Sequence, residues 1–349
     1  MKTGNDFARV RQALRREGKP EPTPLWELYV DPEVQAAFLG HPLRGPEDEA
    51  EFWVTAGYDF VPVSAGLVRV AGVLAGRTAR HRYSIYTAGE QEMTWAIEGR
   101  GVITNEREFE AFPWPEPEEL DLSHLTELAP FLPPKMKIIC VTGKIFTAVW
   151  MLMGFETFAF ALRENPSLVA RMFEKVGTLQ LEVSRRASEL PEVGGLWMSD
   201  DIAYSEGLLV SPAVLRRYLF PWYRELGREL REKGLLFIYH SDGRLWEVLD
   251  DIVDCGFHGL HPIEPKAMDS RELKAKVGDK LCLLGNIEMD RLARGTPEEI
   301  RKLVWANIRD LAYDGGYCVG SSNSITNYVR LENYRAMLEA VASYPSPGP

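Results

Sequence analysis

The 349-residue sequence lacks the features that mark several classes of protein. Its four cysteines lie far apart and include no C-x-x-C pair, so we expect reduced thiols and a cytoplasmic protein rather than a disulfide framework. Residues 1–20 contain no apolar segment of the kind that a signal peptide has. The longest apolar stretch, residues 145–162, is interrupted by Glu156, which predicts a buried helix and no membrane span.

Positive charge is also scarce, because 40 basic residues stand against 51 acidic ones and the net charge is −11. A nucleic-acid-binding surface needs a basic excess to meet phosphates, so we expect no nucleic-acid partner. The sequence also lacks a glycine-rich phosphate loop, a Walker sequence and a G-x-S-x-G elbow. These absences weigh against dinucleotide binding, ATP binding and serine-hydrolase chemistry.

What the sequence does contain is a series of short apolar runs, most of them followed by a stretch compatible with a helix. The candidate strands are Pro24–Leu28, Tyr58–Ser64, Met136–Thr142, Gly195–Ser199, Leu235–His240, Gly256–His261, Lys280–Gly285 and Gly316–Gly320. Eight such alternations predict an α/β protein with a parallel (β/α)8 TIM barrel, formed by residues 1–349 as a single domain. Helix starts carry a capping residue before proline, most clearly at Thr296, where Glu299 completes a capping box.

Residues 67–134 interrupt this alternation between the second and third candidate strands. Alternating apolar residues in Glu92–Ile97 and Gly101–Glu108 predict a hairpin around residues 98–101. The remainder is rich in proline and acidic residues. We therefore expect an irregular, hairpin-containing N-terminal insertion on the surface of the barrel.

Polar side chains follow the candidate strands at the points where the strands end. Because the carboxyl ends of parallel barrel strands meet at one mouth, we expect these side chains to converge there. The set is Glu27, Ser64, Thr142, Asp200, Asp201, His240, Asp242, His261, Glu264, Asn286, Glu288, Cys318, Ser321 and Asn323.

His240-x-Asp242 is the most specific pattern in this set. Two side chains two residues apart, just past a strand, can share one metal ion or one substrate, His with a borderline nitrogen and Asp with a hard oxygen. The alternative is that His240 is a hydrogen-bonded histidine at a strand end and that Asp242 caps the next helix.

Two further patterns place carboxylates at strand ends. Asp200 and Asp201 can bind a cation, orient a substrate or transfer a proton. The alternative is one loop carboxylate beside one helix N-cap. His261 and Glu264 again offer a histidine and a carboxylate, and either group has a structural alternative.

Several segments of the chain resemble those of a known family. The segments that carry the resemblance are DDIAYSEGLLVSP, FIYHSDG, GLHPIEPKAMD, LLGNIE, GTPEEI, GGYCVGSSNSI and ENYRAMLEA. In this order they resemble the uroporphyrinogen decarboxylase superfamily, which holds the haem-pathway decarboxylase and the cobalamin-dependent methyltransferases. The resemblance implies a (β/α)8 barrel with its site at the carboxyl mouth.

Two positions favour the methyltransferase branch. The decarboxylases carry an R-Q-A-G-R segment that grips substrate carboxylates, whereas residues 24–30 contain no arginine here. They also carry an aspartate after the next strand, which Val63-Ser-Ala-Gly66 lacks. The methyltransferases bind zinc through H-x-C and a later Cys, and this chain has His240, Asp242 and Cys318 at those positions.

The resemblance therefore implies an enzyme that moves a methyl group between a small substrate, such as a methoxylated aromatic, and a corrinoid (cobalamin) carried by a partner protein. It implies zinc held by His240, Asp242 and Cys318, and homodimers occur in the superfamily. We expect Asp200, Asp201 and Glu264 to be catalytic and Glu27, His261, Asn286 and Asn323 to bind substrate. The alternatives are a metal-free decarboxylase of a porphyrinogen-like carboxylate and a non-catalytic corrinoid- or tetrapyrrole-binding protein.

Overall fold

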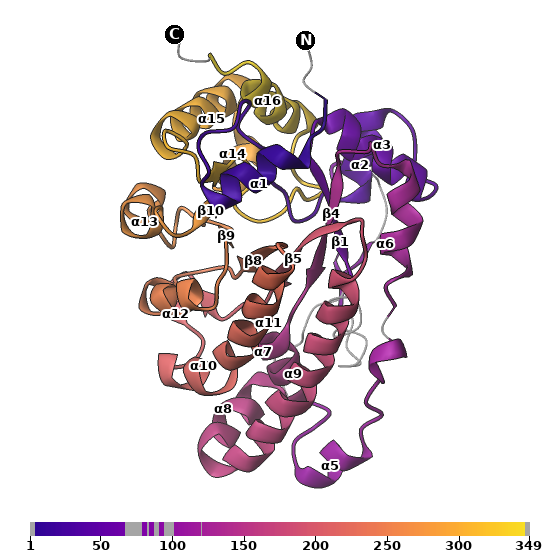
Figure 1. Cartoon of the computed structure of the whole chain (residues 1–349), viewed down its shortest axis with the longest axis vertical. Helices are drawn as coiled ribbons and strands as arrows, with labels where there is room; N and C mark the ends of the chain where they lie inside the picture. The colour runs from indigo at the N-terminus through magenta and orange to yellow at the C-terminus, as the bar shows by residue number, and fades with distance from the viewer. Residues whose placement is uncertain are drawn as a thin grey trace.

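A parallel sheet of seven strands forms the centre of the structure, a computed structural model that describes residues 4–66, 79–81, 84–86, 91–93, 101–119 and 121–345 (Figure 1). The strands lie in the order β1-β4-β5-β8-β9-β10-β11. Their bounds are β1 Phe60–Ser64, β4 Lys137–Thr142, β5 Val193–Ser199, β8 Leu236–His240, β9 Gly259–His261, β10 Cys282–Leu284 and β11 Tyr317–Cys318. All six pairings between neighbours are parallel, as the alternation of strands and helices predicts.

The strands are apolar almost throughout because both faces of the sheet are covered. All five residues of β8 are buried, and in β4 only Lys137 is partly exposed. The register aligns Ser199 with His240, and His240 with His261. Three neighbouring strands therefore end at the same level, and the residues that follow them share one edge.

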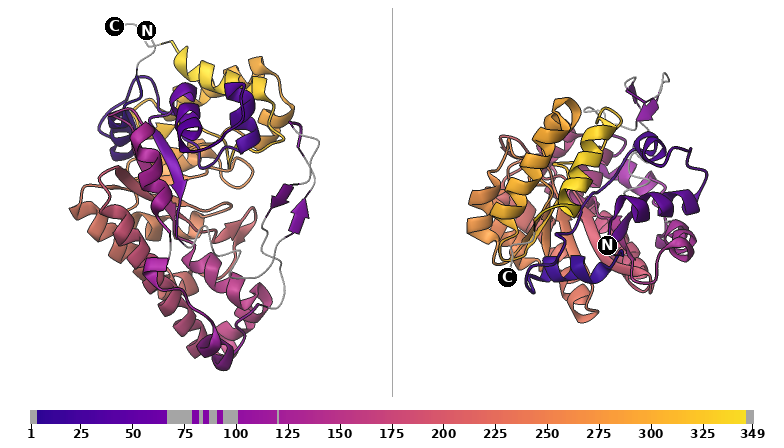
Figure 2. Two further views of the ribbon diagram at one scale, coloured as in Figure 1. Left: turned by 90° about the vertical axis from the view of Figure 1, so that its right-hand side faces the viewer. Right: turned by 90° about the horizontal axis from the view of Figure 1, so that it is seen from above.

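Helices follow the strands and pack outside the sheet (Figure 2). Their bounds are α1 Phe7–Arg15, α2 Pro32–Leu39, α3 Pro46–Ala56, α5 Glu106–Ala111, α6 Ser123–Leu128, α7 Ile145–Met153, α8 Phe155–Glu164, α9 Pro166–Ser188, α10 Pro212–Tyr218, α11 Phe220–Glu232, α12 Leu249–Asp254, α13 Ser270–Val277, α14 Met289–Arg294, α15 Pro297–Leu311 and α16 Leu331–Ala342. The capping box of α15 is confirmed, with Thr296 Oγ1 accepting from the Glu299 amide at 3.3 Å. Among the described residues no single helix could cross a membrane; α7 and α8 reach the required length only together, across a 96° bend.

The concave side of the curled sheet is filled by its own side chains. Trp26, Phe60, Trp197 and Ile238 belong to this inner cluster, and each is at most marginally exposed. Helix α1 closes the amino end of the sheet by adding Phe7 and Leu14, among others, to the same cluster. A second, larger cluster lies between the sheet and the outer helices.

The predicted eight-stranded barrel is confirmed in part. Seven of the candidate strands form the sheet, but the first, residues 24–28, contributes only an isolated parallel bridge from Leu25 to Val319 beside β11. Its backbone bonds are Trp26 N to Val319 O at 2.7 Å and Val319 N to Pro24 O at 2.9 Å. The same segment contacts β1 through side chains, because the rings of Trp26 and Phe60 pack with their centroids 4.5 Å apart. The fold is therefore a curled parallel α/β sheet.

The hairpin prediction is wrong in its second arm. Helix α5 begins at Glu106 because Asn105 caps it, accepting from the Glu108 amide at 3.0 Å. The turn at residues 98–101 lies mostly outside the described residues. Within residues 67–134 the structure describes an antiparallel pair of β2 Ala79–His81 with β3 Gln91–Met93, which stands apart from the main sheet in Figure 2. A second short antiparallel pair, β6 Ala203–Tyr204 with β7 Gly207–Leu208, follows β5.

Candidate functional site

Asp201, His240 and Asp242 lie together at the carboxyl edge of the sheet, with their potential ligand atoms within 4.8 Å of one another. We call these three residues the acidic group. His240 Nε2 is 3.5 Å from Asp201 Oδ1 and 3.9 Å from Asp242 Oδ1. The side chains of Asp201 and Asp242 are 42% and 37% exposed, whereas that of His240 is 5% exposed. The group is therefore open to solvent on its carboxylate side only.

The backbone of two neighbouring strands brings these residues together. His240 is the last residue of β8, and its carbonyl accepts from the Asp200 amide at 2.9 Å, so Asp201 follows directly beside it. The Asp242 amide then donates to Asp201 Oδ1 at 3.0 Å. The chain turns at Gly243, whose φ of 89° and close approach to the Tyr204 backbone leave no room for a Cβ atom.

The charges of the acidic group interact strongly. Burial by itself lowers the pKa of His240, but the hydrogen bond and charge of Asp201 and the charge of Asp242 outweigh burial and raise it. Burial raises the pKa of Asp201, but the hydrogen bond from His240 and its charge reverse the direction and lower it. The pKa of Asp242 rises to about 6, because burial and the nearby carboxylates of Asp201 and Glu264 outweigh the charge of His240.

Two predicted residues contact the loop that carries Asp242. Asn323 Nδ2 donates to both carboxylate oxygens of Asp242, at 3.1 and 2.9 Å. Glu264 Oε2 accepts from the Gly243 amide at 3.1 Å. The structure therefore brings Asn323 and Glu264 to the edge of the acidic group, from the segments after β11 and β9.

His261 lies behind His240, among aromatic rings. The two Nδ1 atoms are 2.8 Å apart, and the His261 ring stands at 89° to the Trp197 ring with centroids 4.8 Å apart. Trp197 in turn contacts Trp26 at 4.8 Å. We call Trp26, Phe60, Trp197 and His261 the aromatic floor. His261 is fully buried, and burial holds its pKa well below the ordinary value.

Lys144 is a residue that the sequence reasoning missed. It follows β4, has a φ of 63°, and its positive charge is among the causes that lower the pKa of Asp201. A left-handed conformation is uncommon for a residue other than glycine, asparagine or aspartate and often marks a functional segment. The sequence signal was present only as a lysine after the Gly143 turn, which spacing alone does not distinguish from any surface lysine.

The side chains of three other predicted residues, Asp200, Asn286 and Glu27, make hydrogen bonds within the protein and not with the acidic group. Asp200 caps α7, accepting from the Phe146 amide at 2.9 Å, the Thr147 amide at 2.8 Å and the Tyr223 hydroxyl at 2.6 Å.

Asn286 Oδ1 accepts from Asn307 at 3.0 Å and from the Tyr317 hydroxyl at 2.6 Å, which ties β10 to α15 and β11. Glu27 accepts from the Ser321 amide and hydroxyl, both at 2.7 Å, and burial raises its pKa to about 8. Glu27 therefore fixes the first strand segment to the chain after β11.

Cys318 is placed in the sheet interior. It is fully buried in the inner cluster, and burial together with a contact to Cys282 raises the pKa of its thiol well above the ordinary value. The charge of Asp59, which pairs with Arg9 of α1 at the amino end, also acts on it. Among the described residues the thiol is not part of the group that can hold a metal, so the structure separates Cys318 from His240 and Asp242.

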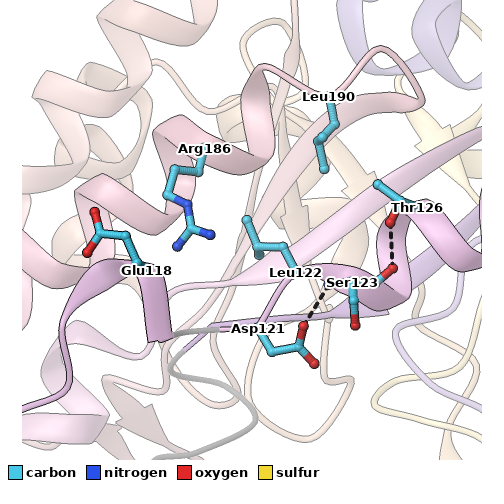
Figure 3. A pocket seen from close by; sticks show the side chains of 7 residues that line it. All are labelled: Glu118, Asp121, Leu122, Ser123, Thr126, Arg186 and Leu190. Carbon is cyan, nitrogen blue, oxygen red and sulfur yellow. Dashed lines mark hydrogen bonds between the residues drawn. The ribbon is translucent and has the colours of Figure 1, made fainter.

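Two other features lie elsewhere on the molecule. His41, Asp48 and Glu51 form a second cluster of potential ligand atoms, but their side chains are 39%, 22% and 51% exposed. A pocket of about 360 Å³ lies beside the end of α9 (Figure 3). Its described lining includes Arg186, Leu190 and Glu118 but none of the predicted site residues.

The acidic group fits a zinc ion. Zinc takes imidazole nitrogen and carboxylate oxygen at about 2.0–2.2 Å in a tetrahedral arrangement, so two of its ligand atoms lie about 3.4 Å apart. The 3.5 Å from His240 Nε2 to Asp201 Oδ1 matches this separation, and the 3.9 Å to Asp242 Oδ1 needs the partly exposed Asp242 carboxylate to move inward by a few tenths of an ångström. Asn323 and His261 would hold Asp242 and His240 from behind, as second-sphere partners of metal ligands do.

The curled parallel sheet, with its polar groups at the carboxyl ends of the strands, defines an α/β protein of the parallel-sheet class. The family model described as "Uroporphyrinogen decarboxylase (URO-D)" matches residues 100–344, so the chain belongs to the uroporphyrinogen decarboxylase family. Within the superfamily it lies closer to the cobalamin-dependent methyltransferase branch.

Two curated relatives support this placement, and one solved structure shares the fold. "Methylcobamide:CoM methyltransferase MtaA" of Methanosarcina barkeri is 28% identical over 178 residues, and the same-named protein of M. barkeri strain Fusaro is 26% identical. The alignment covers 50% of this chain and 49% of that relative, so the chain spans about half the length of the curated relatives it matches. A methyltransferase from Methanosarcina mazei shares the fold with a TM-score of 0.72, at 17% identity over 96% of this chain and 98% of that one.

Proposed function

We propose that this protein is a methyltransferase that moves a methyl group between a small substrate and a corrinoid carried by a partner protein. The observation that carries the proposal is the acidic group, a metal-compatible set of side chains at the strand ends of a chain in this family. The curated relatives, which are named methylcobamide:CoM methyltransferases, support the reaction class.

In this proposal His240 Nε2 and the carboxylates of Asp201 and Asp242 hold zinc, and Cys318 takes no part. Zinc bound there would supply a Lewis acid beside the substrate atom that carries the methyl group. Asn323 keeps both oxygens of Asp242 in place. Lys144 adds a positive charge near Asp201, which suits negative charge developing on a substrate.

The donor set favours an oxygen-bearing substrate. One nitrogen and two hard carboxylate oxygens replace the softer H-x-C and Cys set of the resemblance, and thiolate-rich sites suit soft partners. We therefore propose demethylation of a methoxylated aromatic. A corrinoid in the cobalt(I) state, carried by the partner protein, would supply the electron pair that accepts the methyl group; the electron pair of the broken carbon–oxygen bond would remain on the substrate oxygen, which would take a proton.

Glu264 is the proposed proton donor. It lies at the edge of the acidic group, half-buried and held by the Gly243 amide at 3.1 Å. A positioned general acid contributes about 10²- to 10⁴-fold to rate. Glu264→Gln should therefore retain metal but transfer methyl groups at least about 100-fold more slowly.

The proposal is tested by mixing the zinc-loaded protein with cob(I)alamin and a panel of methoxylated aromatics. The expected result is conversion of the cob(I)alamin spectrum to that of methylcob(III)alamin, together with release of the phenol. His240→Ala should abolish the conversion, whereas the remote variant Asn165→Ala should not. Absence of any spectral change across the panel, with metal bound and the protein folded, contradicts the proposed function.

A further inference from the structure

His240 and His261 end two neighbouring strands as a register pair. Their rings are stacked at 30° with centroids 5.0 Å apart, and their Nδ1 atoms are 2.8 Å apart. Both residues are buried, His240 at 4% and His261 at 0% exposure. The hydrogen bond between them is therefore sheltered from water, and its geometry is fixed by the sheet.

The two Nδ1 atoms share one proton, because a hydrogen bond has one donor and one acceptor. His240 Nε2 faces the carboxylates of Asp201 and Asp242 at 3.5 and 3.9 Å. An imidazole nitrogen binds a metal through its lone pair, so a ligating Nε2 requires the ring proton to be on Nδ1. His240 must then donate to His261 Nδ1, and His261 must carry its own proton on Nε2.

The surroundings of His261 agree with this arrangement. Its Nε2 is buried, and within the described parts of the chain it has no hydrogen-bond partner. The ring stands at 89° to that of Trp197, 4.8 Å away, an edge-to-face contact in which an N–H group can lie against an aromatic face. Trp26, which also belongs to the inner cluster, packs against Trp197 with the two ring centroids 4.8 Å apart.

We infer that His261 is a positioning residue that holds His240 in the tautomer whose Nε2 binds metal. This deepens the proposed function and rests on its metal site. Metal-bound histidines usually donate to a carboxylate, a carbonyl or water, which raises the basicity of the ligand. An imidazole acceptor adds no negative charge, so Asp201 and Asp242 remain the two anionic groups that face the metal.

The first test is zinc and cobalt(II) affinity, measured by competition with a chromophoric chelator. His261→Phe keeps a ring against Trp197 but removes the acceptor, and should weaken metal binding by about 10- to 100-fold. His261→Asn places an amide oxygen near the position of Nδ1 and should restore most of the affinity. His258→Asn is the matched control, because His258 accepts from the Phe237 amide at 3.0 Å at the other end of the same strand segment.

Unchanged affinity in a folded His261→Phe variant would overturn the inference. Equal losses in His261→Asn and His261→Phe would also do so, because they would show a requirement for the ring and not for the acceptor.

A second measurement does not depend on any variant folding. Nitrogen-15 NMR of histidine-labelled wild-type protein should show His261 protonated at Nε2 and unprotonated at Nδ1, with a coupling across the Nδ1–Nδ1 hydrogen bond. A proton on His261 Nδ1 in the metal-loaded protein contradicts the inference. If the wild-type protein binds no metal but shows the expected tautomer, the proposed function fails while the positioning of His240 stands.

Discussion

The acidic group and the aromatic floor meet at His240 and His261, which end β8 and β9, yet the surroundings of their polar atoms differ. In the acidic group the charged atoms face one another and partly face solvent. In the aromatic floor, Trp26 Nε1, Trp197 Nε1 and His261 Nε2 are buried without a hydrogen-bond partner in the described regions. The His240–His261 hydrogen bond is the contact that joins the two.

The comparison distinguishes the acidic group, whose charged atoms can meet a metal or substrate, from the aromatic floor, which packs behind the acidic group. Charged side chains lie where water and substrate can enter, and rigid rings lie where only packing is possible. His240 belongs to both regions, since its Nε2 faces the carboxylates and its Nδ1 faces His261. Removing the Trp26, Phe60 or Trp197 ring should therefore lower stability, whereas changes in the acidic group, or at His261 behind it, should alter metal binding.

The largest expected effect is on the floor. Trp197→Ala removes a fully buried ring that contacts both Trp26 and His261, and should lower the free energy of unfolding by about 3–5 kcal/mol. Urea unfolding measures the loss. Trp305→Ala, at a partly exposed ring on α15, should cost less. Equal losses in the two variants would remove the distinction between floor and surface.

The next effect concerns pH and Glu27, a carboxyl beside the floor. Its pKa is raised from 4.5 to about 8, so between these values the folded protein holds a proton that the unfolded chain has released. Stability should therefore fall as pH rises through this window, by up to about 1.4 kcal/mol per pH unit. Glu27→Gln should make stability fall less steeply with pH in urea unfolding between pH 5 and 8, by up to about 1.4 kcal/mol per pH unit.

Glu299→Gln is the control for this measurement. The pKa of Glu299 is lowered by its hydrogen bonds to Thr296, so its contribution lies below the window and the slope should remain. A slope unchanged in Glu27→Gln would show that another group is responsible.

A smaller effect is expected at Asn323, which donates to both oxygens of Asp242. Asn323→Ala should weaken zinc binding by about tenfold, at the low end for second-sphere partners, and leave the fold intact. Competition with a chelator measures the change. Asn165→Ala, which removes the N-cap of α9 far from the site, should lower stability without changing zinc affinity.

The smallest effect on metal is expected at Cys318. Because its thiol lies in the sheet interior beside Cys282, Cys318→Ala should leave the zinc content unchanged. Cys318→Ala and Cys282→Ala should each cost on the order of 1 kcal/mol, as removal of one buried methyl-sized group does. Loss of zinc in Cys318→Ala alone would show that Cys318 reaches the metal.

Much of the fold could be predicted from the sequence, because buried parallel strands are continuous apolar runs. The strand ends at Ser199, His240 and His261 were predicted to the residue. The sequence does not show that the first candidate strand differs from the others. Pro24–Leu28 has the same apolar pattern as the true strands, but it pairs with a neighbouring strand only through the Leu25 bridge. The predicted second arm of the hairpin is wrong because the Asn105 side chain caps helix α5, and this local hydrogen bond outweighs the alternation of apolar residues in residues 101–108.

The site was predictable as a set of residues but not as a geometry. Asp200 and Asp201 are adjacent in sequence, and nothing in the sequence shows that the first caps α7 while the second faces His240. Cys318 ends a strand of only two residues, so its inward direction could not be inferred from alternation. The position of Lys144 near the acidic group follows from a left-handed backbone conformation, which cannot be predicted from the sequence.

The most direct test of the central claim is the zinc content of the purified protein beside that of Asp201→Ala, His240→Ala and Cys318→Ala, measured by inductively coupled plasma mass spectrometry. We expect about one zinc per chain in the wild-type protein and in Cys318→Ala, and loss of zinc in Asp201→Ala and His240→Ala. No zinc in a folded wild-type protein after loading, or zinc that survives the His240 change, would contradict this expectation.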